Sequence, residues 1–182
     1  MSVWEKGVMT EKGNALLTKL HSGTTLSITR AVAGAGSVTS DEMSSLTSIP
    51  DERQEMTFST KSYPVENQCA VPLKLTSTGV TEGYKVTVIG IYAFDPDEGE
   101  ILYMAAKAVE GKELDVPSEA EHSAFSAVWT FYVKYGQADG VTITVDPSNS
   151  VTMADLEQAL NNVAFETITT DQIDTLFNEY IT

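Results

Sequence analysis

The sequence predicts an α+β fold in which an antiparallel, sandwich-like β-sheet carries an N-terminal helix and C-terminal helices. Two observations predict it. Alternating apolar runs, separated by turn residues, fill the chain from Leu26 to Val145. Apolar residues at helical spacing occur near both ends, within residues 10–20 and 151–182. We therefore expect a main α+β domain over residues 1–150 and a C-terminal helical extension over residues 151–182.

The first predicted element is a helix over residues 10–20. Ala15, Leu16 and Leu20 lie near helical spacing, and Thr10 is suited to cap the first turn. Gly23 follows where a helix would end.

A strand over residues 26–33 comes next, since Leu26, Ile28 and Val32 alternate with other residues. The glycine-rich residues 34–36 predict a turn. Thr39 and Glu42 have the spacing of a capping box, which predicts a short helix that ends before Pro50.

Two further strands are predicted over residues 55–63 and 70–77, and residues 80–84 connect them to the next element. Pro64 directly follows the first of these strands, and Pro72 lies within the second. Because proline cannot donate to a sheet, we expect edge or interrupted strands here.

Residues 86–94 and 101–108 predict a β-hairpin that is apolar on both faces. Its turn is well specified, with Asp95 and Pro96 in the favoured first positions and Gly99 at the left-handed one. A hairpin with one wet side would alternate apolar and polar residues. We therefore expect the domain's own helices to cover one face and a neighbouring subunit to cover the other.

A polar stretch over residues 111–122 predicts an exposed excursion. Residues 124–135 then predict a strand, and residues 141–145 alternate as a half-exposed strand does. The residues that share the apolar row of the first of these strands are Phe125, Ala127, Trp129, Phe131 and Val133.

The two predicted C-terminal helices each carry an apolar stripe. Met153, Leu156 and Leu160 form the first stripe. The second, after a break at residues 165–169, consists of Ile173, Leu176, Phe177 and Tyr180.

Charge is distributed unevenly along the chain, whose net charge is −15. Residues 92–182 contain 17 acidic and 3 basic side chains, whereas residues 1–91 contain 9 and 8. Such an acidic surface repels phosphate, so nucleic acid is a poor partner. We expect no membrane insertion and a cytoplasmic location at synthesis, because neither a signal peptide nor an apolar run of membrane-spanning length is found.

The residue types that carry chemistry do not form a recognisable catalytic or metal-binding pattern. Asp95, Asp97, Glu98 and Glu100 could suggest calcium, but their spacing is not that of an EF-hand loop and favours a solvated turn. His21 and His122 lie far apart in the sequence, and the single cysteine, Cys69, is expected to be buried and inert. We therefore expect no enzymatic activity, no metal and no cofactor.

Several aromatic residues leave a sugar-binding platform open as an alternative, since flat aromatic faces stack on pyranose rings. We expect most of them, and Trp129 above all, to lie in the core or at a subunit interface. These residues are Tyr84, Tyr92, Tyr103, Trp129, Tyr132 and Tyr135.

Four stretches, in this order, resemble the N-terminal attachment region of bacteriophage tail-fibre proteins of the tail-collar type. They are residues 10–36, with a helix, a strand and a glycine turn; residues 90–103, the hairpin; residues 127–135 with 141–147; and residues 151–156. The resemblance implies a non-enzymatic structural protein of a phage or prophage tail or baseplate, located in the virion tail and usually multimeric.

The resemblance and the two-faced hairpin together lead to the hypothesis of a fibre attachment or adaptor module. It would contact copies of itself, possibly as a trimer, and other tail proteins. The alternative is a carbohydrate-binding or adhesin module at a cell surface. The apolar residues that we expect at its interfaces are Ile89, Ile91, Tyr92, Phe94, Leu102, Tyr103, Met104, Ile173, Leu176, Phe177 and Tyr180.

Overall fold

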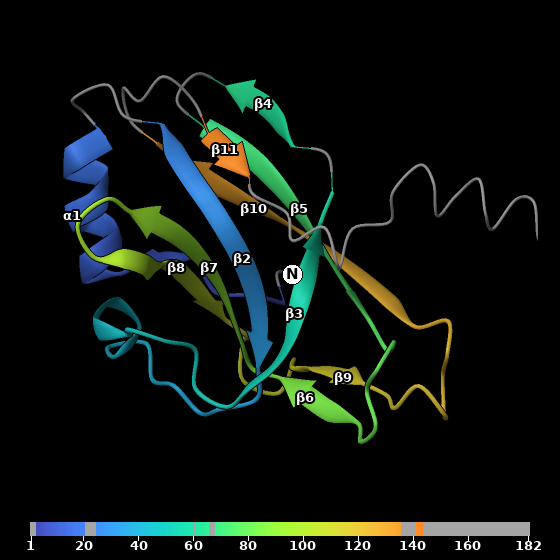
Figure 1. Cartoon of the computed structure of the whole chain (residues 1–182). Helices are drawn as coiled ribbons and strands as arrows, with labels where there is room; N and C mark the ends of the chain where they lie inside the picture. The colour runs from blue at the N-terminus through green and yellow to red at the C-terminus, as the bar shows by residue number, and fades with distance from the viewer. Residues whose placement is uncertain (1–2, 21–24, 60, 66–67, 136–140, 144–182) are drawn as a thin grey trace, which may run out of the picture. The chain divides into compact units, whose positions relative to one another are not determined.

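The computed structural model describes residues 3–20, 25–59, 61–65, 68–135 and 141–143 (Figure 1). The chain divides into two units, Met1–Asn149 and Ser150–Thr182. All described residues belong to the first unit, which is described here by itself. The helices predicted for residues 151–182, on which the α+β class partly depends, lie outside the described residues.

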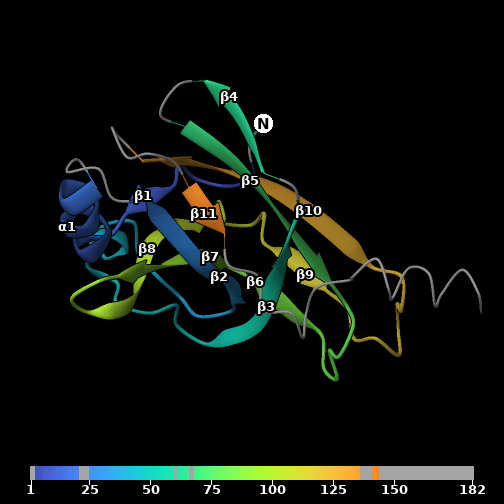
Figure 2. The same ribbon diagram turned by 45° about the horizontal axis from the view of Figure 1, so that its top comes forward.

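The first unit is built around one curled, largely antiparallel sheet, which confirms the predicted antiparallel architecture (Figures 1 and 2). Its main strands follow the order β1-β8-β7-β2-β3-β5-β10, with β4 beside β5 and β11 beside β2. The sheet curls into a half barrel. Its strands are β1 (Val8–Met9), β2 (Leu26–Gly34), β3 (Glu52–Phe58), β4 (Ser62–Val65), β5 (Gln68–Thr76), β7 (Val88–Asp95), β8 (Gly99–Lys107), β10 (Ser126–Lys134) and β11 (Val141–Ile143).

Strand β3 produces the corner of the half barrel because its two ends pair with different neighbours. Its first part pairs with β2, as in Ala31 opposite Met56. Its last residues pair with β5, as in Phe58 opposite Leu73. The main sheet is accompanied by a separate ribbon of β6 (Tyr84–Val86) and β9 (Leu114–Val116).

The concave face of the half barrel contains the main core. Apolar side chains from alternating positions of β2, β5, β7, β8 and β10 meet there and exclude water. The fully buried members include Leu26, Ile28, Val71, Leu73, Leu75, Ile89, Ile91, Tyr103 and Val133. Cys69 belongs to the same core, and burial raises the pKa of its thiol, as expected for an inert cysteine.

Helix α1 (Glu11–Leu20) packs against β8 at one end of this core. As predicted, Thr10 caps it: its hydroxyl accepts a hydrogen bond from the Gly13 N–H at 2.9 Å. A β-carbon added at Gly13 would lie 2.0 Å from the Tyr103 carbonyl oxygen. The helix backbone therefore lies directly against the strand, and the side chains of Leu16 and Leu20 enter the core.

The convex face of the hairpin β7–β8 is covered by the chain itself. Residues 35–50, which include the short 3-10 helix η1 (Met43–Ser45), form a covering loop over it. Met43 and Ile49 of this loop pack on a second apolar cluster. Its sheet residues are Val32, Val88, Tyr92, Leu102 and Ala105.

This arrangement differs from the expectation for the hairpin. Its two faces are apolar as predicted, but one meets the barrel core and the other meets the covering loop. The Ile49 N–H donates a hydrogen bond to the Tyr92 hydroxyl at 3.0 Å, which fastens the loop. Glu42 also accepts hydrogen bonds from the Thr39 N–H and hydroxyl, so the capping box forms, although its helix is a single 3-10 turn.

Of three strand predictions, two require correction. The strand predicted over residues 55–63 is interrupted, as one of the two expectations for it allowed, because β3 ends at Phe58 and β4 begins at Ser62. Strand β5 is central, with β10 on one side and β3 and β4 on the other. Pro72 lies opposite the gap between the end of β3 and the start of β4, where the N–H that proline lacks is not needed for strand pairing. The excursion over residues 111–122 contains β9.

Candidate binding groove

Strand β10 forms one margin of the half barrel and has clearly different faces. Trp129, Phe131 and Val133 pack on the main core, and Ala127 shares their face by alternation along the strand, which confirms the predicted apolar row. Their neighbours along the strand point outward, and two of these are large and apolar. Val128 is 58% exposed and Tyr132 is 55% exposed.

The direction of the β10 peptide groups follows from its pairing with β5. Thr130 lies opposite Pro72, and the Pro72 carbonyl accepts a hydrogen bond from the Ser59 N–H at 2.9 Å, on the far side of β5. A residue's N–H and C=O point to the same side of a strand, so Pro72 and Thr130 are not bonded to each other. The peptide groups of Thr130, and by alternation those of Val128 and Tyr132, therefore point to the open margin.

The N-terminal segment forms the opposite margin. Trp4 pairs with Ala108, and β1 pairs with β8 through Val8 and Met9. Six successive antiparallel pairings lead from β1 to β10. Because six is even, β1 and β10 run in the same direction.

A groove of about 560 Å³ lies between these two margins. The Trp4 and Trp129 rings meet across it edge to face, with centroids 5.5 Å apart and planes at 87°. Met104 and Ala106 of β8 contribute to its lining, which is mainly apolar. The remaining lining residues are Glu5, Lys6, Gly7, Met9, Gln68, Thr130, Phe131 and Tyr132.

Two charged side chains line the groove, and they differ in their partners. Glu5 lies 3.7 Å from the Lys107 ammonium and accepts a hydrogen bond from the Ser40 hydroxyl at 3.1 Å. Lys6 is exposed and has no ion pair with another described residue. Among the described residues, the groove therefore presents one positive charge without an ion-pair partner beside an apolar surface.

The acidic hairpin tip was the other candidate, and it connects the hairpin to α1. Asp95 is 2% exposed and accepts hydrogen bonds from the Lys19 ammonium at 2.7 and 2.8 Å. It also accepts the Asp97 and Glu98 N–H groups, as turn-forming aspartates do. Burial opposes its ionisation, but these hydrogen bonds outweigh that effect and hold the pKa of Asp95 below its usual value. The tip is thus only partly the solvated turn that was expected.

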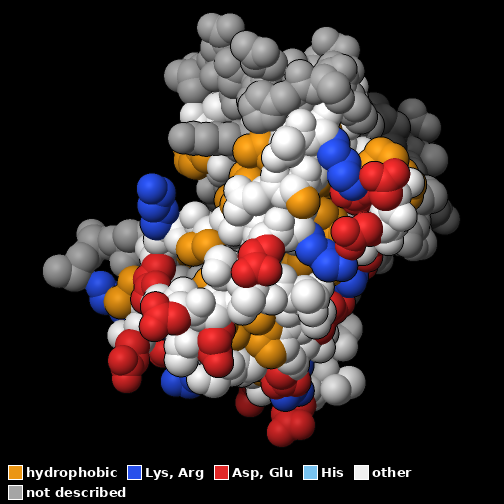
Figure 3. All heavy atoms as spheres, turned by 90° about the vertical axis from the view of Figure 1, so that its left-hand side faces the viewer, with side chains coloured by type: hydrophobic (Ala, Val, Ile, Leu, Met, Phe, Trp, Pro, Cys, Tyr) orange, Lys and Arg blue, Asp and Glu red, His pale blue; other side chains and the backbone are white. Residues whose placement is uncertain are grey.

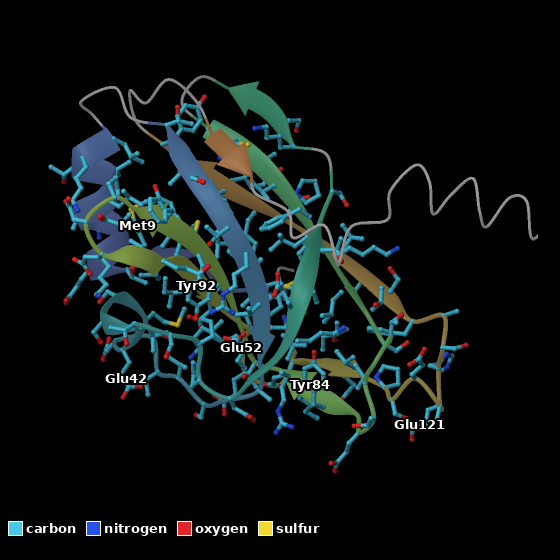
Figure 4. The ribbon with its side chains drawn as sticks, in the orientation of Figure 1. Met9, Glu42, Glu52, Tyr84, Tyr92 and Glu121 are labelled. Atoms are coloured by element: carbon cyan, nitrogen blue, oxygen red, sulfur yellow. The ribbon has the colours of Figure 1, made fainter. Side chains whose placement is uncertain are left out.

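A third cluster, on the outer face of the sheet, is centred on Arg30. Arg30 bonds Glu52 at 2.6 Å and Glu100 at 2.9 Å, and its guanidinium lies 4.1 Å from the centre of the Tyr92 ring. Figure 4 shows Tyr92 and Glu52 in this region and Glu42 on the covering loop. Such a network of ion pair and cation–π contacts stabilises the outer face.

The predicted interface residues lie in different environments. Ile89, Ile91, Leu102 and Tyr103 have no exposed surface, and Tyr92 is 4% exposed, so the chain's own core and covering loop already bury them. Phe94, at 51% exposure, is open to a partner, and Met104 lines the groove. Ile173, Leu176, Phe177 and Tyr180 lie outside the described residues.

The proposed aromatic platform does not assemble as one surface. Tyr92 and Tyr103 are buried, while burial raises the pKa of Tyr84 to about 12 at the β6–β9 ribbon. Trp129 was expected above all in the core or at a subunit interface. It is only partly buried, and its ring contacts that of Trp4 at the groove. Sequence reasoning missed Trp4 and Lys6. The outward row of Val128, Thr130 and Tyr132, rich in strand-forming residues, was a signal that could have found the margin.

The described residues were also searched for a metal site and for a helix that could cross a membrane. No group of three or more His, Cys, Asp and Glu side chains in them could hold a metal ion. Within the same ranges, no helix has the length and apolar character that a membrane crossing requires. The α1 side of the surface carries acidic and basic groups next to one another (Figure 3).

Comparison with protein-family models found no match, and searches of curated proteins and of solved structures found none either.

Proposed function

We propose that this chain is a non-enzymatic structural component of a phage or prophage tail or baseplate, acting as a fibre attachment or adaptor module through oligomerisation. The resemblance of its sequence to tail-collar type fibre proteins is the reason for the virion assignment. After synthesis in the cytoplasm, the protein would be incorporated into the virion tail.

The structural observation that supports a binding role is the margin formed by β10. Natural sheets usually protect such margins with lysines, prolines, bulges or a covering segment. Here Val128 and Tyr132 are exposed beside peptide groups that have no partner among the described residues. Exposed apolar surface next to an open strand is typical of a site where another protein attaches.

Two measurements test this function. Particles induced from the source strain should contain the protein at a constant ratio to the major tail protein, measured by mass spectrometry of gradient-purified virions. Purified protein should form a defined oligomer in the micromolar range, measured by light scattering after size exclusion. Absence from particles that contain all other tail proteins would overturn the virion assignment, and a monomer at every concentration would exclude autonomous oligomerisation.

The groove also supports the carbohydrate-binding alternative. Trp4, Trp129 and Tyr132 line it together with the polar Gln68 and Thr130, a mixture that suits a sugar. Binding on a glycan array that disappears in Tyr132→Ala, with the melting temperature retained, would favour this second function. A matched Phe94→Ala variant, exposed but away from the groove lining, should keep the binding.

A further inference from the structure

We propose that the groove between β1 and β10 accepts one extended segment of a partner protein, which adds to the sheet as a strand antiparallel to both margins. The inference rests on the proposed attachment function and specifies the chemistry of its partner. That segment would carry apolar side chains at alternating positions and a carboxylate opposite Lys6.

The direction of the margins is the first argument. Because β1 and β10 run in the same direction, they cannot complete an antiparallel sheet by pairing with each other. A single strand of opposite direction between them would be antiparallel to both neighbours. The half barrel would then continue through the groove with the pairing type that it uses from β1 to β10.

Backbone hydrogen-bonding capacity is the second argument. Val128, Thr130 and Tyr132 direct N–H and C=O groups toward the open edge of β10, and Thr130 and Tyr132 line the groove. On the other wall, the Thr10 N–H bonds the Tyr103 carbonyl, so the adjacent Met9 directs its peptide groups away from β8. Strand addition uses such groups for affinity and side-chain pockets for selectivity.

The character of the groove selects the occupant. Its lining from Trp4, Met9, Met104, Trp129 and Phe131 suits the apolar side chains on one face of an extended peptide. Lys6 is exposed and lacks an ion-pair partner among the described residues, whereas Glu5 already contacts Lys107. Charge complementarity therefore favours an acidic residue in the partner segment.

The probe for the test is a displayed library of random nine-residue peptides, matched to the nine residues of β10 and selected against the full-length protein. We expect enriched peptides with alternating apolar residues and at least one Asp or Glu. Repeating the selection against Lys6→Glu should replace the acidic residue by a basic one. Failure to enrich any peptide, or the same acidic preference with Lys6→Glu, would overturn the proposal.

The enriched peptide also allows a measurement of its position. On binding, hydrogen exchange should slow at the amides of Val128, Thr130 and Tyr132. The amides of Trp129 and Phe131, which face β5, should exchange slowly in both states. Protection elsewhere without protection of these three amides would overturn the proposal. Concentration-dependent protection without peptide would identify a second copy as the occupant and would also overturn it.

Thr130→Pro tests whether the peptide groups of β10 bind the peptide. The substitution removes an N–H that points to the groove, and this N–H does not bond to β5. Peptide affinity should fall about tenfold or more in fluorescence anisotropy, while the melting temperature stays near that of the parent protein. If this variant fails to fold, the Lys6→Glu selection and the exchange pattern still decide the question. The protein could bind the peptide and yet be absent from virions. That result would support the strand-accepting groove and overturn only the proposed function.

Discussion

Strands β7 and β8 have most of both faces covered and both edges paired, whereas β10 has one exposed face and, among the described residues, one unpaired edge. The hairpin is enclosed by the barrel core and by the covering loop of residues 35–50. By contrast, β10 pairs with β5 alone among the described strands and exposes Val128 and Tyr132. Apolar content therefore does not identify the surface that is available to a partner. The pairing of peptide groups does so more directly, because an unpaired margin retains donors and acceptors.

The largest expected difference between the two regions is in stability. Leu102 on β8 is completely buried under the covering loop. Leu102→Ala should lower the free energy of unfolding by about 2–5 kcal/mol, through lost apolar burial and the cavity left behind. Val128→Ala on β10 should change it by less than about 0.5 kcal/mol. Urea denaturation followed by circular dichroism measures both, and equal losses would contradict the comparison.

A smaller effect is expected from the hydrogen bond that fastens the covering loop. Tyr92→Phe keeps the ring but leaves the buried Ile49 N–H without its acceptor. We expect a loss of about 1–2 kcal/mol, the usual cost of an unsatisfied buried group. Tyr132→Phe, whose ring is mostly exposed, is the matched control on β10 and should have almost no effect. Thermal denaturation of both variants distinguishes a fastened loop from one that merely lies on the sheet.

Much of the fold could be predicted because local signals agreed with it. Thr10 caps α1, residues 26–33 form β2, and Gly99 occupies the left-handed position of the hairpin turn with a φ of 82°. These features depend on neighbouring residues, which periodicity and turn chemistry describe. They are confirmed with small changes in bounds.

Other features depended on contacts between distant segments and could not be predicted. The sequence of the hairpin indicates two apolar faces, but not that residues 35–50 fold back over one of them. Similarly, the meeting of Trp4 and Trp129 joins residues that are 125 positions apart. Alternation along β10 identifies its inner row, whereas its position at a margin results from the order of all the strands.

The acidic hairpin tip should make the hairpin region sensitive to acid. The pKa of Asp95 is lower in the folded state than its usual value near 4, so its contribution to stability is present above that pH. It should be lost as the pH falls through the folded-state pKa. Asp95→Asn should cost about 1 kcal/mol at neutral pH and reduce this acid dependence. Asp97→Asn, at a carboxylate that is 74% exposed, is the control. Denaturation curves between about pH 2 and pH 7, a range that spans the ordinary carboxyl pKa, test both variants.

The smallest effect on stability is expected for the outer row of β10, where the effect on association should be largest. The double variant Val128→Thr, Tyr132→Thr has β-branched side chains that suit a strand at both positions, and it removes exposed apolar surface. Its free energy of unfolding should remain within about 0.5 kcal/mol of the parent value. Its affinity for the enriched nine-residue peptide, measured by fluorescence anisotropy, should fall about tenfold or more. The Phe94→Thr variant removes an exposed aromatic side chain from the hairpin and should leave association unchanged. The opposite result, with association lost in Phe94→Thr alone, would move the contact surface from β10 to the hairpin. It would thereby reverse the comparison between the two regions.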